Sequence, residues 1–367
     1  MKTSVSSSAT RQPAFDPAPP EGWEVVGCVS PLAEPLSAEV QAHIDWLIEG
    51  PIRLPDGMVA AWVDADGPTG AYAEATGYTL TLFCYLYRLT GERRYAAEAR
   101  RTAIALAVSA TGADSLGRRG VGYLFDSAIG LRALGALFQT FPDLLADPAL
   151  ADAVDLHRRL ADSACDWIGQ RLARRPQPDS GSRWSDAFNA HMIKAVGHAA
   201  PWCGETIARE AADSLIRERF ADGLFATDPD GGSYLHAHCY GLEGLLLWPE
   251  NPPRRAAWVV ACGAAKLAEL QTASGGLPRR LPTAPGESND ETAADATAQA
   301  VRVWQCVDAD RYARNIARGL GFLRLLSDPG GGFGYAATSD HLNAWTTVFA
   351  VQALIWQNRK PEPVWIV

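Results

Sequence analysis

Helical segments of two kinds alternate along most of this 367-residue sequence, and this alternation constrains the fold more than any other feature. The segment ATGYTLTLFCYLYRLTG, residues 75–91, is apolar on nearly all sides, as expected for a helix surrounded by other helices. The next segment, ERRYAAEARRTAIALA, has one apolar and one polar face and is typical of a surface helix. Strand-like alternation is scarce. The sequence therefore predicts an all-α protein built from helix pairs.

The pairs repeat with a period of about 50 residues. Markers near the start of the six apolar segments are separated by 48, 60, 50, 54 and 50 residues, and they are Tyr78, Asp126, Asp186, His236, Asp290 and Asp340. Periods of this length are typical of repeated helical hairpins. The apolar helices are expected to begin near residues 76, 124, 185, 235, 290 and 340.

Six apolar and six amphipathic helices suit a closed ring. Five amphipathic segments lie between the apolar ones, and a sixth, SAEVQAHIDWLIEG at residues 37–50, precedes them all. An amphipathic first helix and an apolar last helix can complete each other where the ring closes. The sequence predicts an (α/α)6 barrel, or α-toroid, of six inner and six outer helices in one domain at residues 23–367, after a flexible arm at residues 1–22. An open solenoid of twelve helices is the alternative.

Charge and hydropathy exclude several kinds of partner. The net charge is −9 and the pI is near 5.3, so no basic surface for nucleic acid is expected, and an acidic surface disfavours anionic membranes. No stretch approaches the roughly 20 unbroken apolar residues of a membrane span, and the N-terminal residues lack the apolar region of a secretory signal. We expect a soluble, cytoplasmic protein, whose oligomeric state the sequence does not indicate.

The cysteines are odd in number and far apart in the sequence. Several of them fall within predicted apolar helices, and the seven are Cys28, Cys84, Cys165, Cys203, Cys239, Cys262 and Cys306. A scattered, odd set is typical of reduced thiols in a cytoplasm. We therefore expect no disulfide framework.

Several helix pairs resemble those of known carbohydrate enzymes. The segments TLFCYLYRLTGERRYAAEARRTAIAL and YLFDSAIGLRALGAL with LADAVDLHRRLADSACDWI are similar to the helix pairs of (α/α)6-barrel six-hairpin glycosidases and related lyases. HAHCYGLEGLL and HLNAWTTVFAVQAL are similar to later inner helices of such barrels. The resemblance spans roughly residues 37–357. It implies that the inner-helix N-termini, with the six markers, surround one substrate cleft.

Other α-toroid families resemble parts of the sequence less well. HCYGLEGLL resembles the zinc-bearing end of protein prenyltransferase β subunits, but Ala237 occupies the position of their histidine. VDADG and DETAAD lack the spacing of the aspartate-rich acid motif of terpene cyclases. PWCGE followed by HAHCYG is similar to the zinc elements of lanthionine cyclases, with the Cys-His order reversed. An isoprenoid-handling toroid remains an alternative function.

A polar stripe crosses the apolar helix near residue 235. His236, Tyr240 and Glu243 follow one another at helical spacing, so we expect all three to face the barrel axis. In apolar surroundings a carboxyl group is held in its protonated form, which suits Glu243 to acid catalysis. Two other interpretations are that the histidines only make internal hydrogen bonds, or that His236, Cys239 and Cys203 bind zinc, although their spacing fits no zinc motif. We expect no metal.

Acidic residues near the helix starts have two interpretations. A carboxylate in the first turn caps free N–H groups, and glycoside cleavage uses two carboxyl groups across a bond. Asp126 and Asp290 are therefore added to the predicted catalytic set of His236, Tyr240 and Glu243. Lyase chemistry would instead use a base such as His236 beside Tyr240. The residues leave this choice open.

Aromatic residues recur in the Gly-rich segments that lead into the inner helices. Flat aromatic side chains suit sugar faces. The predicted substrate-binding residues are Trp62, Tyr72, Tyr78, Trp184, Asp186, Asp340, His341 and Trp345. No cofactor is predicted, because the glycine clusters lack the Lys-Ser/Thr of a phosphate-binding loop. We expect an enzyme acting on a sugar or glycosylated small molecule by hydrolysis or lyase-type elimination; the third alternative is a non-catalytic, ligand-binding toroid.

Overall fold

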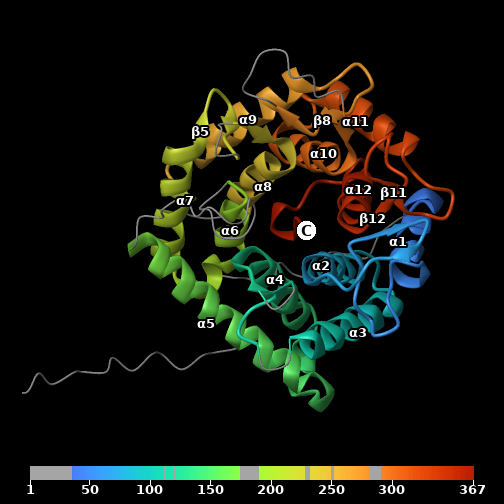
Figure 1. Ribbon diagram of the computed structural model, residues 1–367, viewed down its shortest axis with the longest axis vertical. Coiled ribbons are helices and arrows are strands. Elements are labelled where there is room, and N and C mark those ends of the chain that lie inside the picture. Colours follow the sequence, from blue (N-terminus) through green and yellow to red (C-terminus); the bar gives the residue numbers. More distant parts are fainter. Residues whose placement is uncertain are drawn as a thin grey trace, which may run out of the picture.

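A computed structural model describes residues 35–110, 113–118, 121–173, 190–227, 232–248, 252–281 and 291–367. Over these residues the chain forms two concentric rings of α-helices (Figure 1). The inner helices are α2 (Ala73–Thr90), α4 (Leu124–Thr140), α6 (Met192–Cys203), α8 (Leu235–Leu246), α10 (Ala294–Asp308) and α12 (Ala344–Trp356). The outer helices are α1 (Ala38–Glu49), α3 (Arg93–Ser109), α5 (Ala151–Ala173), α7 (Glu205–Arg219), α9 (Ala256–Leu270) and α11 (Ala313–Leu325).

The inner ring is closed. Each inner helix packs against the next one along the chain, and α12 packs against α2. The predicted (α/α)6 barrel is confirmed, and the open solenoid is excluded. Two inner helices begin where predicted, at Leu124 and Leu235, whereas α6 begins seven residues later than the predicted residue 185. The arm at residues 1–22 lies outside the described residues, so the domain division at residue 22 stays a prediction.

Burial explains the two kinds of helix. In α12 every residue except Trp345 is buried, because other elements surround the helix. In α7 the buried positions, among them Ala208, Ala212 and Leu215, follow a single stripe. Two inner helices approach each other closely where a glycine leaves room between them. A Cβ on Gly244 of α8 would lie only 2.5 Å from the main-chain nitrogen of Lys194 on α6. This contact brings two buried polar residues, Lys194 and Glu243, to the same level of the barrel.

Short antiparallel strands connect the helices. They are β1 (Trp62–Asp64), β2 (Gly67–Pro68), β3 (Gly117–Arg118), β4 (Val121–Gly122), β5 (Phe220–Ala221), β6 (Leu224–Phe225), β7 (Ser233–Tyr234), β8 (Leu277–Pro278), β9 (Arg280–Leu281), β10 (Thr292–Ala293), β11 (Phe333–Gly334) and β12 (Leu342–Asn343). Three 3-10 helices, η1 (Pro142–Ala146), η2 (Pro148–Leu150) and η3 (Pro363–Trp365), complete the described elements.

The seam of the ring, where the last helices meet the first ones, joins distant parts of the chain. One four-stranded sheet has the order β11-β12-β1-β2, and Trp62 of β1 lies opposite Asn343 of β12. On the outside, Arg324 at the end of α11 forms a salt bridge with Glu39 of α1, with Nε and Oε1 2.7 Å apart. The seam therefore places Trp62 beside the start of α12.

The final residues of the sequence lie inside the inner ring. Figure 1 shows this end of the chain at the centre of the barrel. Ile366 and Val367 are buried, and the main-chain oxygen of Trp365 accepts a hydrogen bond from Gln352 Nε2 at 2.6 Å. The Arg132 guanidinium donates to the main-chain oxygen of Val364. This segment fills the axis of the barrel below the polar residues of the inner helices.

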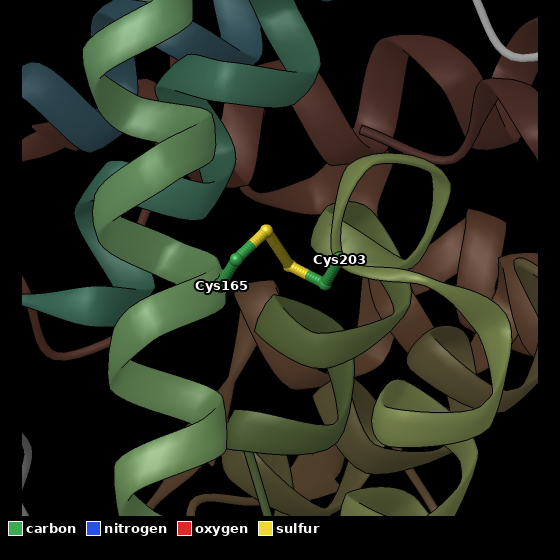
Figure 2. Close-up of a disulfide and its surroundings, with 2 residues drawn as sticks. All are labelled: Cys165 and Cys203. Atoms are coloured by element: carbon green, nitrogen blue, oxygen red, sulfur yellow. A yellow bond between two sulfur atoms is a disulfide. The ribbon is translucent and has the colours of Figure 1, made fainter. Parts of the chain in front are cut away.

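Cys165 of α5 and Cys203 of α6 form a disulfide (Figure 2). Their Cα atoms are 4.7 Å apart, within the range that a disulfide spans. The expectation that all cysteines are reduced is therefore wrong for this pair, because residues 38 positions apart in sequence meet where two helices pack. Disulfides persist mainly in oxidising compartments, so the cytoplasmic location stays a prediction without support from the thiols.

None of the helices among the described residues is both long enough and apolar enough to cross a membrane.

Candidate functional site

A cavity of about 620 Å³ opens at one end of the barrel. Residues from the first turns of all six inner helices, or from the positions just before them, line it, so the inner helices all begin at this end. Its aromatic residues are Trp62, Tyr72, Tyr123, Phe125, Tyr234, Tyr240, Tyr335 and Trp345. Its acidic residues are Glu74, Asp126, Glu291, Asp295 and Asp340. The cavity thus combines flat apolar surfaces with carboxylates.

Tyrosines occupy the N-cap positions of three inner helices. Tyr72, Tyr123 and Tyr234 precede α2, α4 and α8 with extended backbone, and none makes a side-chain cap hydrogen bond. N-caps normally favour Ser, Thr, Asp or Asn, whose short side chains satisfy free N–H groups. Here the extended residue instead contributes an aromatic ring to the cavity wall. The tyrosines at these helix starts therefore line the cavity and do not act as ordinary N-caps.

Glu74 lies between two tyrosine hydroxyls. The Tyr240 hydroxyl donates to Glu74 Oε1 at 3.1 Å, and the Tyr72 hydroxyl donates to Glu74 Oε2. Both tyrosines and Glu74 line the cavity, and Glu74 is 8% exposed. Burial raises the pKa of the Tyr240 hydroxyl well above its usual value of 10.0, so it stays protonated at neutral pH. Tyr240 is therefore a hydrogen-bond donor in this site.

His236 is held through one ring nitrogen. Its Nδ1 lies 3.1 Å from Asp295 Oδ2 and 2.9 Å from Gln299 Oε1, both on α10. The ring packs edge-on against Tyr240, with centroids 4.3 Å apart. The side chain of His236 is 21% exposed and lines the cavity, whereas Asp295 is 3% exposed. With Nδ1 occupied, Nε2 is the nitrogen available to a molecule in the cavity.

A buried ion cluster lies below the cavity. Lys194 Nζ is 2.9 Å from Glu243 Oε2, and the Arg302 guanidinium contacts Glu243 Oε1. All three side chains are fully buried. Burial lowers the pKa of Lys194 to about 8, a shift that the nearby Glu243 charge opposes. The main-chain oxygen of Val367 accepts hydrogen bonds from both cations, at 2.7 Å from Lys194 and 3.0 Å from Arg302.

The rim of the cavity is formed by the segments before α10 and α12. His341 stacks on Tyr335 with ring centroids 5.8 Å apart, and its Nδ1 lies 2.7 Å from Ser339 Oγ. Arg279 forms a salt bridge with Glu291 at 3.1 Å. These groups offer both hydrogen-bond donors and acceptors at the opening of the cavity.

Most of the described residues predicted for the site do line the cavity. They are Trp62, Tyr72, Asp126, His236, Tyr240, Asp340, His341 and Trp345. Trp184, Asp186 and Asp290 lie outside the described residues, and their roles stay predictions.

Two of the predicted residues lie below the cavity. Tyr78 is 1% exposed and stacks on Tyr240 from beneath, with ring centroids 6.4 Å apart. Glu243 faces the axis as predicted, but the two cations, rather than apolar side chains, surround it. The expected environment of Glu243 is therefore wrong, because its partners come from other helices.

Several lining residues were not predicted from the sequence. Asp295 lies in the first turn of α10, five positions after the marker Asp290. Glu74 lies in the first turn of α2, and His191 is the N-cap of α6. The sequence indicates these residues only through their position, since each is the polar residue nearest the start of an inner helix. The markers missed them because the actual helix starts differ from the expected ones by several residues.

Metal binding finds no support among the described residues, where no group of three or more His, Cys, Asp or Glu side chains is placed to hold an ion. Of the suggested zinc ligands, Cys203 is in the disulfide, and Cys239 Sγ lies 3.8 Å from the main-chain oxygen of Ala296. Activity without a metal stays a prediction.

The closed double ring, with its cavity at the start of the inner helices, defines the protein as an (α/α)6 barrel. An unsaturated glucuronyl hydrolase specific for heparin shares the fold at 14% identity and a TM-score of 0.62, over 87% of this chain and 95% of that one. A cellobiose 2-epimerase from Bacillus thermoamylovorans shares it at 14% identity and a TM-score of 0.63, over 86% and 97%. The α-1,6-mannanase of a Salegentibacter species matches at 12% identity and a TM-score of 0.58, over 87% and 98%. No family model and no curated protein matches the sequence.

Proposed function

We propose that this protein is an enzyme that binds a saccharide or glycosylated small molecule in the cavity and acts on it by hydrolysis or lyase-type elimination. The observation that carries the proposal is the pairing of His236 with Asp295 at an aromatic-lined opening. A histidine paired with a carboxylate through one ring nitrogen can take up or release a proton at the other nitrogen. His236 is therefore the proposed proton-transferring residue, and Asp295 stabilises the imidazolium that forms.

The cavity also carries side chains of the kind that glycoside cleavage uses. Glu74, Asp126 and Asp295 come from three different inner helices and are each less than 10% exposed. A carboxyl group on each side of a glycosidic bond supplies the acid and the base or nucleophile of hydrolysis. The Tyr240 hydroxyl donates its proton to Glu74, so its oxygen can accept a hydrogen bond from a substrate hydroxyl. The aromatic wall provides flat apolar surfaces for sugar rings.

The shared fold supports the substrate class. The similar structures named above include a glucuronyl hydrolase, a cellobiose epimerase and a mannanase, each named for action on a saccharide. Fold alone does not carry a reaction from one protein to another. The proposal for this chain therefore depends on His236, Asp295 and the carboxylates of the cavity.

Two alternatives fit the cavity less well. An isoprenoid cyclase would need a deep apolar aromatic chamber, whereas five acidic residues line this cavity. A non-catalytic toroid would use its acidic residues as helix caps. Asp295 Oδ1 does accept from the neighbouring Ala296 N–H, but Oδ2 contacts His236, and Glu74 accepts from two tyrosines. These acidic groups are thus directed at other side chains of the site.

The test is a screen of saturated and unsaturated glycosides of neutral, aminated and uronic sugars. Hydrolysis incorporates ¹⁸O from labelled water, whereas elimination releases a product with a new C=C bond that absorbs ultraviolet light. His236→Asn is expected to reduce kcat by a factor of about 10² or more, with little change in melting temperature because the ring is partly exposed. At the rim, His341→Asn should change KM more than kcat. Conversion of isoprenoid diphosphates but of no glycoside would overturn the proposal.

A further inference from the structure

A chain of buried hydrogen bonds connects His236 with the ion cluster below the cavity. Gln299, which is fully buried, places Oε1 2.9 Å from His236 Nδ1 and Nε2 3.2 Å from Glu243 Oε2. We infer that Gln299 is a positioning residue that, oriented by Glu243, holds His236 in the tautomer with its proton on Nδ1 and leaves Nε2 as the basic nitrogen at the cavity. This inference deepens the proposed function, on which its catalytic meaning rests.

The direction of each hydrogen bond follows from the groups at the ends of the chain. An ionised carboxylate only accepts hydrogen bonds, so Glu243 receives the amide N–H of Gln299. The amide oxygen of Gln299 then faces His236. Asp295 presents a second oxygen to the same nitrogen. With two acceptors at Nδ1, this nitrogen must be the donor, because an unprotonated Nδ1 would face two oxygen atoms with no proton between them.

Glu243 is held firmly enough to orient an amide. Lys194 and Arg302 bind its two oxygens from α6 and α10. Lys194 in turn lies over the rings of Tyr78 and Tyr240, 4.9 and 4.6 Å from their centroids. Arg302 also donates to Gln352 Oε1 at 2.9 Å. A flipped Gln299 would place its oxygen against the Glu243 carboxylate, so the cluster permits only one orientation of the amide.

Other charged and titratable groups also surround His236. Beside it lie Asp295 and Tyr240, below it Glu243, Lys194 and Arg302, and across the cavity and at its rim Glu74, Asp126, His191, Arg279, Glu291, Tyr335, Asp340 and His341. Of the contacts that His236 makes with other described residues, only those with Asp295 and Gln299 reach a ring nitrogen. The tautomer is therefore decided by these two side chains, and an experiment must separate their contributions.

Removal of Asp295 isolates the effect of Gln299. Ring ¹⁵N chemical shifts of His236 report which nitrogen carries the proton, and they need no substrate. We expect the Nδ1–H tautomer in the unmodified protein and in Asp295→Ala, where Gln299 remains. In the double variant Asp295→Ala/Gln299→Met the ring should change to mostly Nε2–H, the form that neutral imidazole side chains favour in water. The matched control is Asp295→Ala/Gln305→Met, since Gln305 is a buried glutamine of α10 that bonds to Ala353 O instead.

Two outcomes would overturn the inference: loss of the Nδ1–H tautomer in Asp295→Ala alone, or its retention in the double variant. If Asp295→Ala/Gln299→Met does not fold, Asp295→Ala/Gln299→Asn replaces it, because asparagine is one methylene too short to span His236 and Glu243. When a substrate is known, the single variant Gln299→Met should lower kcat about tenfold with little change in KM, as expected for a misoriented base. The NMR result tests the positioning and the turnover tests the proposed function, so the two can fail separately.

Discussion

Lys194 Nζ and Glu243 Oε2 lie 2.9 Å apart, and neither side chain has any exposure to solvent. A buried charge pair contributes little net stability relative to apolar side chains, but removal of one partner leaves the other uncompensated. In this barrel the uncompensated groups would be two cations, Lys194 and Arg302, since both contact the same carboxylate. Glu243 is therefore required for the inner ring to tolerate its two buried cations.

The first prediction follows from this cluster. Glu243→Gln is expected to lower the free energy of unfolding by about 3–5 kcal/mol, because it leaves buried positive charge without a counter-ion. Chemical denaturation monitored by circular dichroism measures the change. The matched control is Glu269→Gln, whose exposed salt bridge with Lys266 is expected to contribute about 1 kcal/mol or less. Equal stability of the two variants would show that Glu243 is not needed for charge balance.

A second prediction concerns the aromatic rim. Trp62 is 37% exposed and packs edge-on against Trp345, with ring centroids 6.3 Å apart. If Trp62 contacts a sugar ring, Trp62→Ala should raise KM roughly three- to tenfold, the equivalent of about 0.5–1.5 kcal/mol for one aromatic contact. Trp258→Ala is the control, because Trp258 is 50% exposed but packs against Phe220, away from the cavity. Similar KM values for both variants would remove Trp62 from the binding surface.

The disulfide provides a third prediction. Cys165 and Cys203 close a loop with a sequence separation of 38, which restricts the unfolded chain. A Cys165→Ser/Cys203→Ser variant should lose roughly 2–4 kcal/mol of stability. Cys262→Ser, at a free and partly exposed cysteine, should change stability little. Thiol alkylation followed by peptide mass spectrometry tests the pairing itself, and complete alkylation of Cys165 and Cys203 without a reductant would contradict it.

The fourth prediction is a loss of stability in mild acid. Burial lowers the pKa of His157 to about 4 and that of His238 to about 3, from an ordinary value of 6.5. Both are neutral in the folded protein, whereas the unfolded chain binds protons once the pH falls below about 6.5. Their contribution to stability is therefore complete above pH 6.5. It declines as the pH falls toward 4, by up to about 1.4 kcal/mol per pH unit for each histidine.

Unfolding free energies measured between pH 7 and pH 4, roughly the interval set by these pKa values, test the decline. His238→Gln should reduce the slope, because glutamine can accept the hydrogen bond that His238 Nδ1 receives from the Phe225 N–H at 3.1 Å, yet does not titrate. A slope that is unchanged in this variant would show that His238 does not contribute.

Much of the fold could be predicted because the ring imposes a simple rule on each helix. An inner helix such as α12 must be apolar on almost all sides, and this shows in the sequence as a run without a polar face. The period of the runs then gives the number of hairpins. The predicted starts of the helices were less accurate, because the extended residues before α10 and α12 pair as strands β10 and β12 before the helices begin. A helical pattern does not show where such a bridge ends.

The site was predicted only in part, because its contacts join separate helices. The stripe of His236 and Tyr240 follows from helical spacing within α8 and does reach the cavity. The two charged partners of Glu243 lie 49 and 59 positions away in sequence, and no pattern within α8 indicates them. A single Lys or Arg within an otherwise apolar inner helix is the only signal, since such a charge must find a buried partner.

The seam between the two ends of the ring has a consequence for the order in which the barrel folds. Neighbouring hairpins elsewhere in the ring are contiguous in sequence, whereas Arg324 and Glu39 are 285 positions apart. An open array of repeats gains stability one interface at a time, but the last hairpin of a closed ring forms two interfaces in a single step. Bringing distant segments together costs chain entropy before the contacts between them form. Assembly of the barrel should therefore be cooperative. An unclosed ring would expose two apolar edges at once, which makes premature association of incomplete barrels the main hazard of folding.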